Sequence, residues 1–192
     1  MLDPDGYPDI PVDELLADIK ARKNFIDGVV VSGGEPTIDA GLPAFLTELK
    51  RLDLQVKLDT NGLLADVIAA LLKARLVDYI SVDIKTSPRR YSELHTVAVD
   101  TGGLMQTVEL LRTADIDVEY RTTCIPGLVT PQEIDDIGEM VRGASLWVLQ
   151  QYVAEHAMYE QWQQFEPYTP EALLSLAEQA EKYVGVVQTR GL

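Results

Sequence analysis

The sequence has a single cysteine, Cys124, among its 192 residues. One cysteine excludes a disulfide within the chain, because a disulfide needs two. It also excludes a metal or iron–sulfur centre that is held by several thiolates of this chain. We therefore interpret Cys124 as a small, buried apolar side chain.

Basic residues are scarce as well. The chain has 16 Lys and Arg residues against 31 Asp and Glu residues, which gives a net charge of −15. Binding to the phosphates of a nucleic acid needs clustered positive charge, so the composition argues against a nucleic-acid partner. We interpret the acidic excess as a solvated surface.

Long apolar runs are also missing. No stretch approaches the ~18 to 20 apolar residues of a membrane-spanning helix, and the chain does not open with a basic segment followed by an apolar one. We expect a protein without a membrane segment that is located in the cytoplasm. The length fits one α/β domain that covers residues 1–192.

The chain does contain two kinds of hydrophobic period, which alternate every ~25 to 35 residues, the length of a strand and its crossover helix. Apolar residues at helical spacing begin at Val12, Leu42, Leu64, Leu104, Ile134 and Leu173. Short apolar runs typical of strands begin at Gly28, Leu54, Val77, Val118, Ser145 and Val184. The pattern predicts an α/β fold with a mostly parallel sheet.

Polar residues gather where five of these predicted strands end. The carboxyl ends of parallel strands share one rim, so we expect these side chains to meet there. Because side chains alternate along a strand, Asp83 should share a face with Lys85, and Asp59 with Asn61. The five segments are Ser32–Glu35, Asp59–Gly62, Asp83–Lys85, Arg121–Thr123 and Gln150–Tyr152.

Each of these segments also has a purely structural interpretation. The two glycines can form a turn, and they lack the spacing of a P-loop or of a dinucleotide fingerprint. Asp83 and Lys85 can form a structural ion pair, and Arg121 can neutralise a carboxylate at the rim. His95 is interpreted as a loop or surface histidine. The coincidence of five polar strand ends is what favours a functional site.

Five segments together resemble the radical S-adenosylmethionine enzymes. They are "SGGEPT", "LDTNG", "SVDIKTSPRRY", "YRTTCIPGLVT" and "LQQY" with the later "EPYTPEAL", in that order along nearly the whole chain. Within this superfamily they resemble most closely the activating proteins of anaerobic ribonucleoside-triphosphate reductase, and more distantly the pyruvate formate-lyase activating enzymes. The resemblance implies an open, partial βα barrel.

The resemblance also implies a set of site residues for S-adenosylmethionine. The methionyl amino group would lie at Gly33, Gly34 and Glu35, where Pro36 keeps Glu35 out of the helical region. Further cofactor-binding positions are Asn61, Asp83, Lys85 and Arg121, with Asp83 and Lys85 near the ribose and the carboxylate and Arg121 at the rim. A monovalent cation would be held by Asp59, Thr60 and Asp83.

The chemistry that the resemblance implies is the formation of a glycyl radical. In the family, a [4Fe-4S] cluster, which receives its electron from a donor such as flavodoxin or ferredoxin, reduces the cofactor. The resulting 5′-deoxyadenosyl radical takes a hydrogen atom from a glycine of the partner reductase. The protein holds the cofactor and the glycine in line and excludes water.

The chain departs from the family in one large respect. It has no CxxxCxxC motif, and its strand at Gly28 corresponds to the family's second strand. We predict an inactive, truncated radical SAM domain without the first strand, and we assign no catalytic residue. Two alternatives remain, a cluster-free module that binds S-adenosylmethionine or a partner, and a radical enzyme that acts on a small molecule. The bare edge at 29–32 predicts self-association, or another segment that covers it.

Overall fold

The computed structural model describes residues 9–94, 99–157 and 160–192, and His95 lies outside them. Within these residues the chain forms one six-stranded sheet in which every neighbouring pair is parallel. The strands follow their sequence order across the sheet, which confirms the predicted βα fold. They are β1 (Gly28–Val31), β2 (Gln55–Thr60), β3 (Tyr79–Asp83), β4 (Asp117–Cys124), β5 (Leu146–Gln151) and β6 (Val186–Arg190).

All six predicted helices are present, and short helices occupy the loops. Thr130 starts α5 with a reciprocal capping box, in which the Glu133 carboxylate accepts a hydrogen bond from the Thr130 backbone N–H at 3.1 Å. The helices are α1 (Val12–Arg22), α2 (Leu42–Arg51), α3 (Ala65–Lys73), α4 (Gly102–Leu111), α5 (Pro131–Met140), α6 (Glu160–Gln163) and α7 (Pro170–Ala180), with 3-10 turns η2 (Pro36–Ile38), η3 (Pro88–Glu93) and η4 (Ala154–His156).

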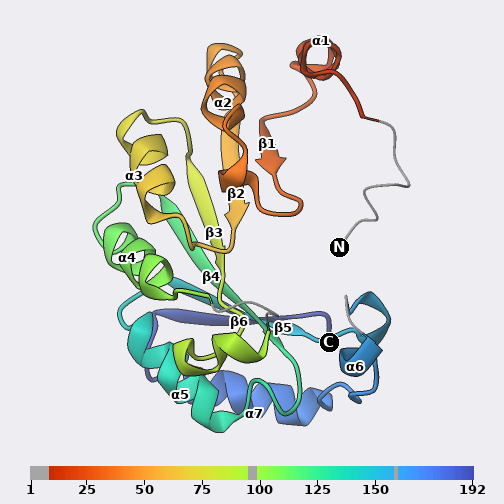
Figure 1. The fold of residues 1–192 in the computed structure, drawn as a ribbon, viewed down its shortest axis with the longest axis vertical. Helices are drawn as coiled ribbons and strands as arrows, with labels where there is room; N and C mark the ends of the chain where they lie inside the picture. The colour runs from red at the N-terminus through yellow and green to blue at the C-terminus, as the bar shows by residue number, and fades with distance from the viewer. Residues whose placement is uncertain (1–8, 95–98, 158–159) are drawn as a thin grey trace.

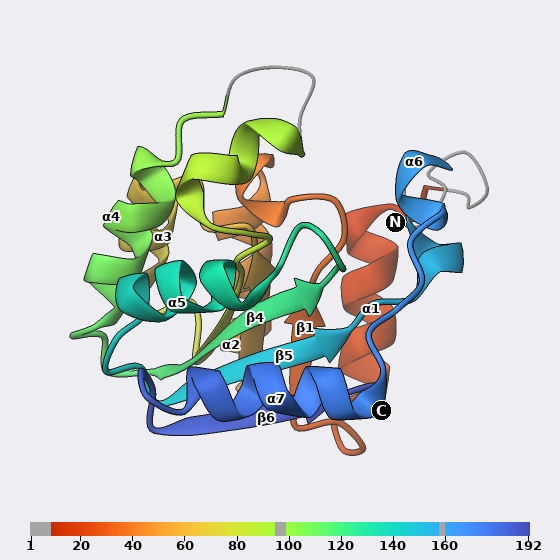
Figure 2. The same ribbon diagram turned by 90° about the horizontal axis from the view of Figure 1, so that it is seen from below.

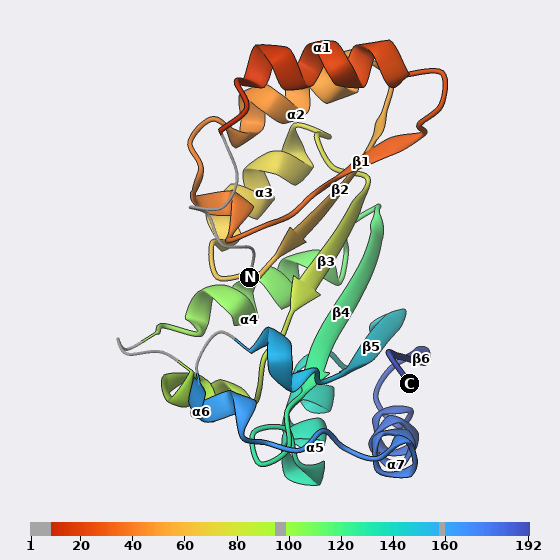
Figure 3. The ribbon, with the colours of Figure 1, turned by 90° about the vertical axis from the view of Figure 1, so that its right-hand side faces the viewer.

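The helices cover one face of the sheet. Figure 1 shows α2, α3, α4, α5 and α7 along the outside of the curved sheet, and Figure 2 shows α5 beside β4 and α7 beside β6. Figure 3 shows α1 beside α2, near β1. The first and last strands do not pair with each other, so the barrel is open, as the sequence predicts.

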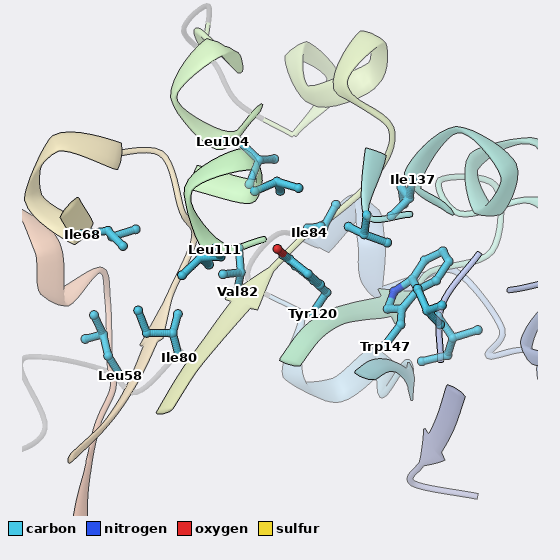
Figure 4. Close-up of a cluster of buried hydrophobic side chains, with 14 of the residues drawn as sticks. Leu58, Ile68, Ile80, Val82, Ile84, Leu104, Leu111, Tyr120, Ile137 and Trp147 are labelled. Carbon is cyan, nitrogen blue, oxygen red and sulfur yellow. The ribbon is translucent and has the colours of Figure 1, made fainter. Parts of the chain in front are cut away.

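Side chains alternate between an apolar and a polar face. Many helix-facing positions are fully buried, among them Leu58 on β2, Ile80 and Val82 on β3 and Trp147 on β5 (Figure 4). The opposite, concave face carries mostly polar side chains. Lys57 of β2, for example, lies beside Tyr79 of β3 on this face. This alternation aims the polar side chains of the strands into the interior of the open barrel.

Within the described residues, no helix combines the length and the apolar character that crossing a membrane requires.

Candidate functional site

The carboxyl ends of β1 to β5 surround a cavity of about 540 Å³. Its lining includes every residue to which the sequence analysis assigned a site: Gly33, Gly34, Glu35, Asp59, Thr60, Asn61, Asp83, Lys85 and Arg121. Gln150, Gln151 and Tyr152 also line it. The structure therefore brings residues from five separated segments to one place, because parallel strands all end at the same rim.

Gly33 and Gly34 form an open, permissive wall of this cavity. Their φ angles are +100° and +51°, in the left-handed region that residues other than glycine rarely adopt. A Cβ atom built on either glycine would meet no other atom within 4 Å. The glycines are thus required by the backbone conformation and not by close packing, and they leave room for a ligand against the main chain.

The Glu35 carboxylate fastens this loop to the end of β2. Its Oε1 atom accepts hydrogen bonds from the Thr37 backbone N–H and hydroxyl at 3.1 and 2.6 Å, and from the Thr60 hydroxyl at 2.7 Å. Its Oε2 atom accepts from the Asn61 N–H at 2.6 Å. Glu35 itself is extended, with φ −138° and ψ 104°, as expected for a residue before proline. Its side chain therefore positions the loop.

Arg121 lies at the centre of the charged part of the cavity. Its Nε donates to Asp83 Oδ1 at 2.8 Å, and one of its terminal nitrogens donates to Asp59 Oδ2 at 3.0 Å. Burial lowers the pKa of Arg121, but the hydrogen bonds and charges of the two carboxylates outweigh this, so its pKa is raised. Arg121 thus does neutralise carboxylates at the rim, and these ion pairs lie inside the candidate site.

Asp83 is held ionised by two cations. Lys85 Nζ lies 3.0 Å from Asp83 Oδ2, opposite the oxygen that Arg121 binds. Burial raises the pKa of Asp83, but Lys85 and Arg121 lower it to below its ordinary value. The Lys85 backbone N–H in turn donates to the hydroxyl of Tyr91 at 3.1 Å. Burial raises the pKa of Tyr91 to about 12, so this phenol stays neutral.

A second charged cluster, which is not among the residues predicted from the sequence, lies below the rim. The side chain of Glu119 is only 1% exposed and accepts hydrogen bonds from Lys57 at 3.1 Å, Tyr79 at 3.0 Å, Ser81 at 2.9 Å and Arg190 at 2.9 Å. Burial raises the pKa of Glu119, but these four donors lower it to about 2. The cluster connects β2, β3, β4 and β6 across the concave face.

A sequence signal for most of this cluster exists. Lys57, Ser81 and Glu119 each stand two residues before a predicted site residue on the same strand. Because a strand has a period of two, each must face the same way as that site residue. Arg190 has no such signal, because it reaches Glu119 from β6 across β5.

Apolar side chains form another part of the cavity wall. They come from the segments that follow the strands, α6 included: Leu63, Leu94, Ile125, Val153, Ala157 and Trp162. A cavity with one charged wall and one apolar wall suits a ligand that carries both charged groups and a flat or apolar part.

Cys124 lies at the end of β4 but faces the helices. Its thiol is fully buried, and burial raises its pKa to about 12. Such a thiol is a poor metal ligand, because the thiolate is the form that binds metals. This agrees with the prediction of a buried apolar side chain.

Comparison with known proteins identifies the superfamily. Residues 3–141 match the Radical SAM superfamily. This chain belongs to the radical SAM superfamily. The predicted superfamily and its partial barrel are therefore confirmed.

Two relatives from Methanocaldococcus jannaschii are similar to this radical SAM chain along most of its length. Both are named as glycyl-radical enzyme activating enzymes, MJ1227 and MJ1632. The first is 30% identical over 93% of this chain and 76% of its own length. The second is 25% identical over 92% of this chain and 69% of its own length.

Solved structures of low sequence identity share the fold. A domain of pyruvate-formate lyase-activating enzyme from Bacteroides vulgatus has a TM-score of 0.65 at 17% identity, covering 85% of this chain and 99% of that one. Streptococcus suis SuiB bound to S-adenosylmethionine has a TM-score of 0.72 at 15% identity, covering 96% of this radical SAM chain and 44% of that one. These matches support the open βα barrel.

The superfamily implies S-adenosylmethionine and a [4Fe-4S] cluster, and the two groups fit this chain differently. S-adenosylmethionine fits, since the open glycine loop, the charged centre and the apolar wall face one cavity. The cluster does not fit, because the one cysteine is buried away from the cavity. No group of three or more His, Cys, Asp or Glu residues in the described part of the chain is arranged to hold a metal ion.

Proposed function

We propose that this chain carries the S-adenosylmethionine site and the partner-facing rim of a cytoplasmic glycyl-radical enzyme activase. The observation that carries the proposal is the cavity at five strand ends in a radical SAM chain that is 30% identical to a protein named as an activating enzyme. The partner proposed is anaerobic ribonucleoside-triphosphate reductase. The resemblance of "LDTNG" and "YRTTCIPGLVT" to its activating proteins supports this choice.

The residues have distinct roles in this proposal. The main chain at Gly33, Gly34 and Glu35 receives the methionyl amino group, since glycine lets a ligand approach the backbone. Asp83 and Lys85 lie toward the ribose and the carboxylate, while Asn61 and Arg121 complete the rim. Together they bind and orient the cofactor and exclude water from it.

When bound, S-adenosylmethionine would supply the radical chemistry that removes a hydrogen atom from a glycine Cα of the partner. Its reduction needs an iron–sulfur cluster and an electron donor such as flavodoxin or ferredoxin. This chain has no residues to hold the cluster, so we propose that alone it binds the cofactor without cleaving it.

Calorimetry with S-adenosylmethionine tests the cofactor site. We expect the wild-type chain to bind and Gly33→Ala to bind at least tenfold more weakly, since an alanine at φ +100° introduces backbone strain of about 1 to 3 kcal/mol. Gly143→Ala is the matched control. Gly143 also has a positive φ, +84°, with open space around it, but it precedes the amino end of β5, away from the cavity. Absence of binding by the wild type, or equal losses in both variants, would contradict the site.

Interferometry with purified reductase tests the partner. We expect the chain to bind anaerobic ribonucleoside-triphosphate reductase and not pyruvate formate-lyase. The reverse preference would overturn the choice of partner while leaving the cofactor site in place.

A second candidate function is a cluster-free module that regulates a reductase without chemistry. The single buried cysteine favours it. The DNA upstream of Met1 separates the two candidates, because an in-frame CxxxCxxC there makes a longer enzyme. If that longer protein, reconstituted with iron and sulfide, cleaves S-adenosylmethionine, the module is excluded. A radical on the glycine of added reductase would also exclude a small-molecule substrate.

A further inference from the structure

The guanidinium of Arg121 occupies the space between the two acidic side chains at which a monovalent cation is expected. It bonds Asp83 and Asp59 through two different nitrogens, at 2.8 and 3.0 Å. All three side chains are largely shielded from solvent, with exposures of 18% for Arg121, 13% for Asp59 and 30% for Asp83. The planar guanidinium therefore bridges the ends of β2 and β3 as a fixed positive charge.

Lysines flank the remaining oxygens of both carboxylates. Lys85 Nζ lies 3.0 Å from Asp83 Oδ2, and Lys57 Nζ lies 3.7 Å from Asp59 Oδ1. Asp59 Oδ1 is buried and accepts no hydrogen bond from the described residues. A metal ion placed there would face both Lys57 and Arg121, and like charges at such distances repel.

The hydroxyl of Thr60, the third predicted cation ligand, is hydrogen-bonded to other groups. The Thr60 hydroxyl donates to Glu35 Oε1 at 2.7 Å and accepts from the Gly62 N–H at 3.1 Å. Thr60 is 3% exposed and alternates with Asp59 along β2, so its hydroxyl does not point the same way as the Asp59 carboxylate. Asp59, Thr60 and Asp83 therefore do not form a common ligand set in this structure.

We infer that the guanidinium of Arg121 takes the place of the monovalent cation that the family resemblance implies at Asp59 and Asp83. The two carboxylates are then neutralised without a metal ion, and the site needs neither potassium nor sodium. The inference rests on the proposed function only where it concerns the binding of S-adenosylmethionine. The charge arrangement itself is testable without the cofactor.

Thermal unfolding at constant ionic strength, in potassium chloride or in choline chloride, tests the inference. Choline is too large to enter a carboxylate pair, so it is the reference cation. We expect the same Tm for the wild type in both salts. Arg121→Gln removes the charge between Asp59 and Asp83, and we expect its Tm to be about 3 to 6 °C higher in potassium, the shift for a roughly tenfold excess of ion over its dissociation constant.

Two control variants separate charge from other effects. Arg121→Lys keeps a positive charge, and we expect its Tm to be equal in both salts. Arg190→Gln removes an arginine from the same concave face that pairs with Glu119 instead, at 2.9 Å, and should also show no preference for potassium. A preference in Arg190→Gln would mean that any lost charge on this face recruits potassium, which overturns a specific role for Arg121.

The wild type keeps the inference falsifiable even if Arg121→Gln does not fold. A higher Tm of the wild type in potassium than in choline would show that a cation binds beside Arg121 or displaces it, and would overturn the inference. Equal Tm values in both salts for a folded Arg121→Gln would overturn it as well. Neither result depends on S-adenosylmethionine, so a failure here is distinct from a failure of the proposed function.

Discussion

At the scale of single residues, one buried carboxylate organises the interior of the open barrel. Glu119 accepts hydrogen bonds from side chains of three other strands, and each bond favours its ionised form. Its neighbour Lys57 also approaches Asp59 within 3.7 Å, which links this cluster to the candidate site. The charge state of Glu119 should therefore govern the stability of the sheet.

Replacement of this carboxylate gives a pH-dependent prediction. The pKa of Glu119 is lowered to about 2 in the folded state, so its stabilising contribution is present above about pH 4.5 and is lost as the pH falls toward 2. We expect Glu119→Gln to lower the free energy of unfolding by about 3 kcal/mol at pH 7, and the deficit to shrink by about 2 kcal/mol at pH 3. Urea unfolding at the two pH values measures this.

The control for Glu119 is an exposed ion pair of the same type. Glu109, whose side chain is 78% exposed, pairs with Arg112 at 2.9 Å. Glu109→Gln should change the free energy of unfolding by no more than about 0.5 kcal/mol at either pH. A deficit of Glu119→Gln that is the same at pH 7 and pH 3 would contradict the role of its charge.

Glu35 gives a second prediction at this scale. Glu35→Gln replaces one acceptor oxygen by an N–H donor, so either the Asn61 N–H or the donors from Thr37 and Thr60 lose a partner. We expect a loss of about 1 to 3 kcal/mol in the free energy of unfolding, measured with urea, and weaker binding of S-adenosylmethionine.

The matched change for Glu35 lies in the same loop. Asp39 Oδ1 accepts one hydrogen bond, from the Gly41 N–H at 2.7 Å, and an amide oxygen can accept the same bond. Asp39→Asn should therefore have a small effect on stability. Equal losses in the two variants would mean that negative charge in the loop, and not the four hydrogen bonds of Glu35, stabilises it.

At the scale of elements, the two edges of the sheet differ in character. The edge strand β1 reads Gly-Val-Val-Val and carries no charge, and its Val30 is 59% exposed. The other edge, β6, carries Gln188 and Arg190. Exposed apolar edges without charges are templates for further strand pairing. The described residues supply no strand that covers the outer side of β1.

We expect the isolated chain to self-associate through β1. Sedimentation velocity over a range of protein concentrations should show a species larger than a monomer, and Val30→Lys should shift the distribution toward the monomer. Val186→Lys is the control, because Val186 is 52% exposed on the other edge strand. A wild type that stays monomeric throughout would refute the prediction, as would an equal effect of both variants.

At the scale of the whole molecule, the chain has the fold of its superfamily but lacks the thiolates for a cluster. Its only cysteine is buried on the helix-facing side of β4. We expect anaerobic reconstitution with iron and sulfide to leave the protein without bound cluster, as judged by visible absorption and iron content. Cys124→Ala should behave identically. A cluster that forms in the wild type and is lost in this variant would show that copies of the chain share thiolates.

The fold was accessible from the sequence because it is encoded locally. The apolar stripe from Leu42 to Leu49 and the run at Val29 each specify one element, and parallel βα units connect in few ways. The rim was accessible for the same reason, since Gly33 follows β1 and both Asp83 and Arg121 lie toward the carboxyl ends of their strands. Glu119 was not found, because a lone acidic residue inside a strand resembles a solvent-facing position until the neighbouring strands are in place.

The sequence by itself determined the order of elements, the superfamily and the absence of cluster ligands, since these depend on residue types and local spacing. Only the tertiary structure decided which charges meet. The pairing of Arg121 with both Asp59 and Asp83 depends on three strands lying in register, and the bond from Arg190 to Glu119 spans 71 residues. Such contacts are set by the curvature and register of the whole sheet, which no local pattern records.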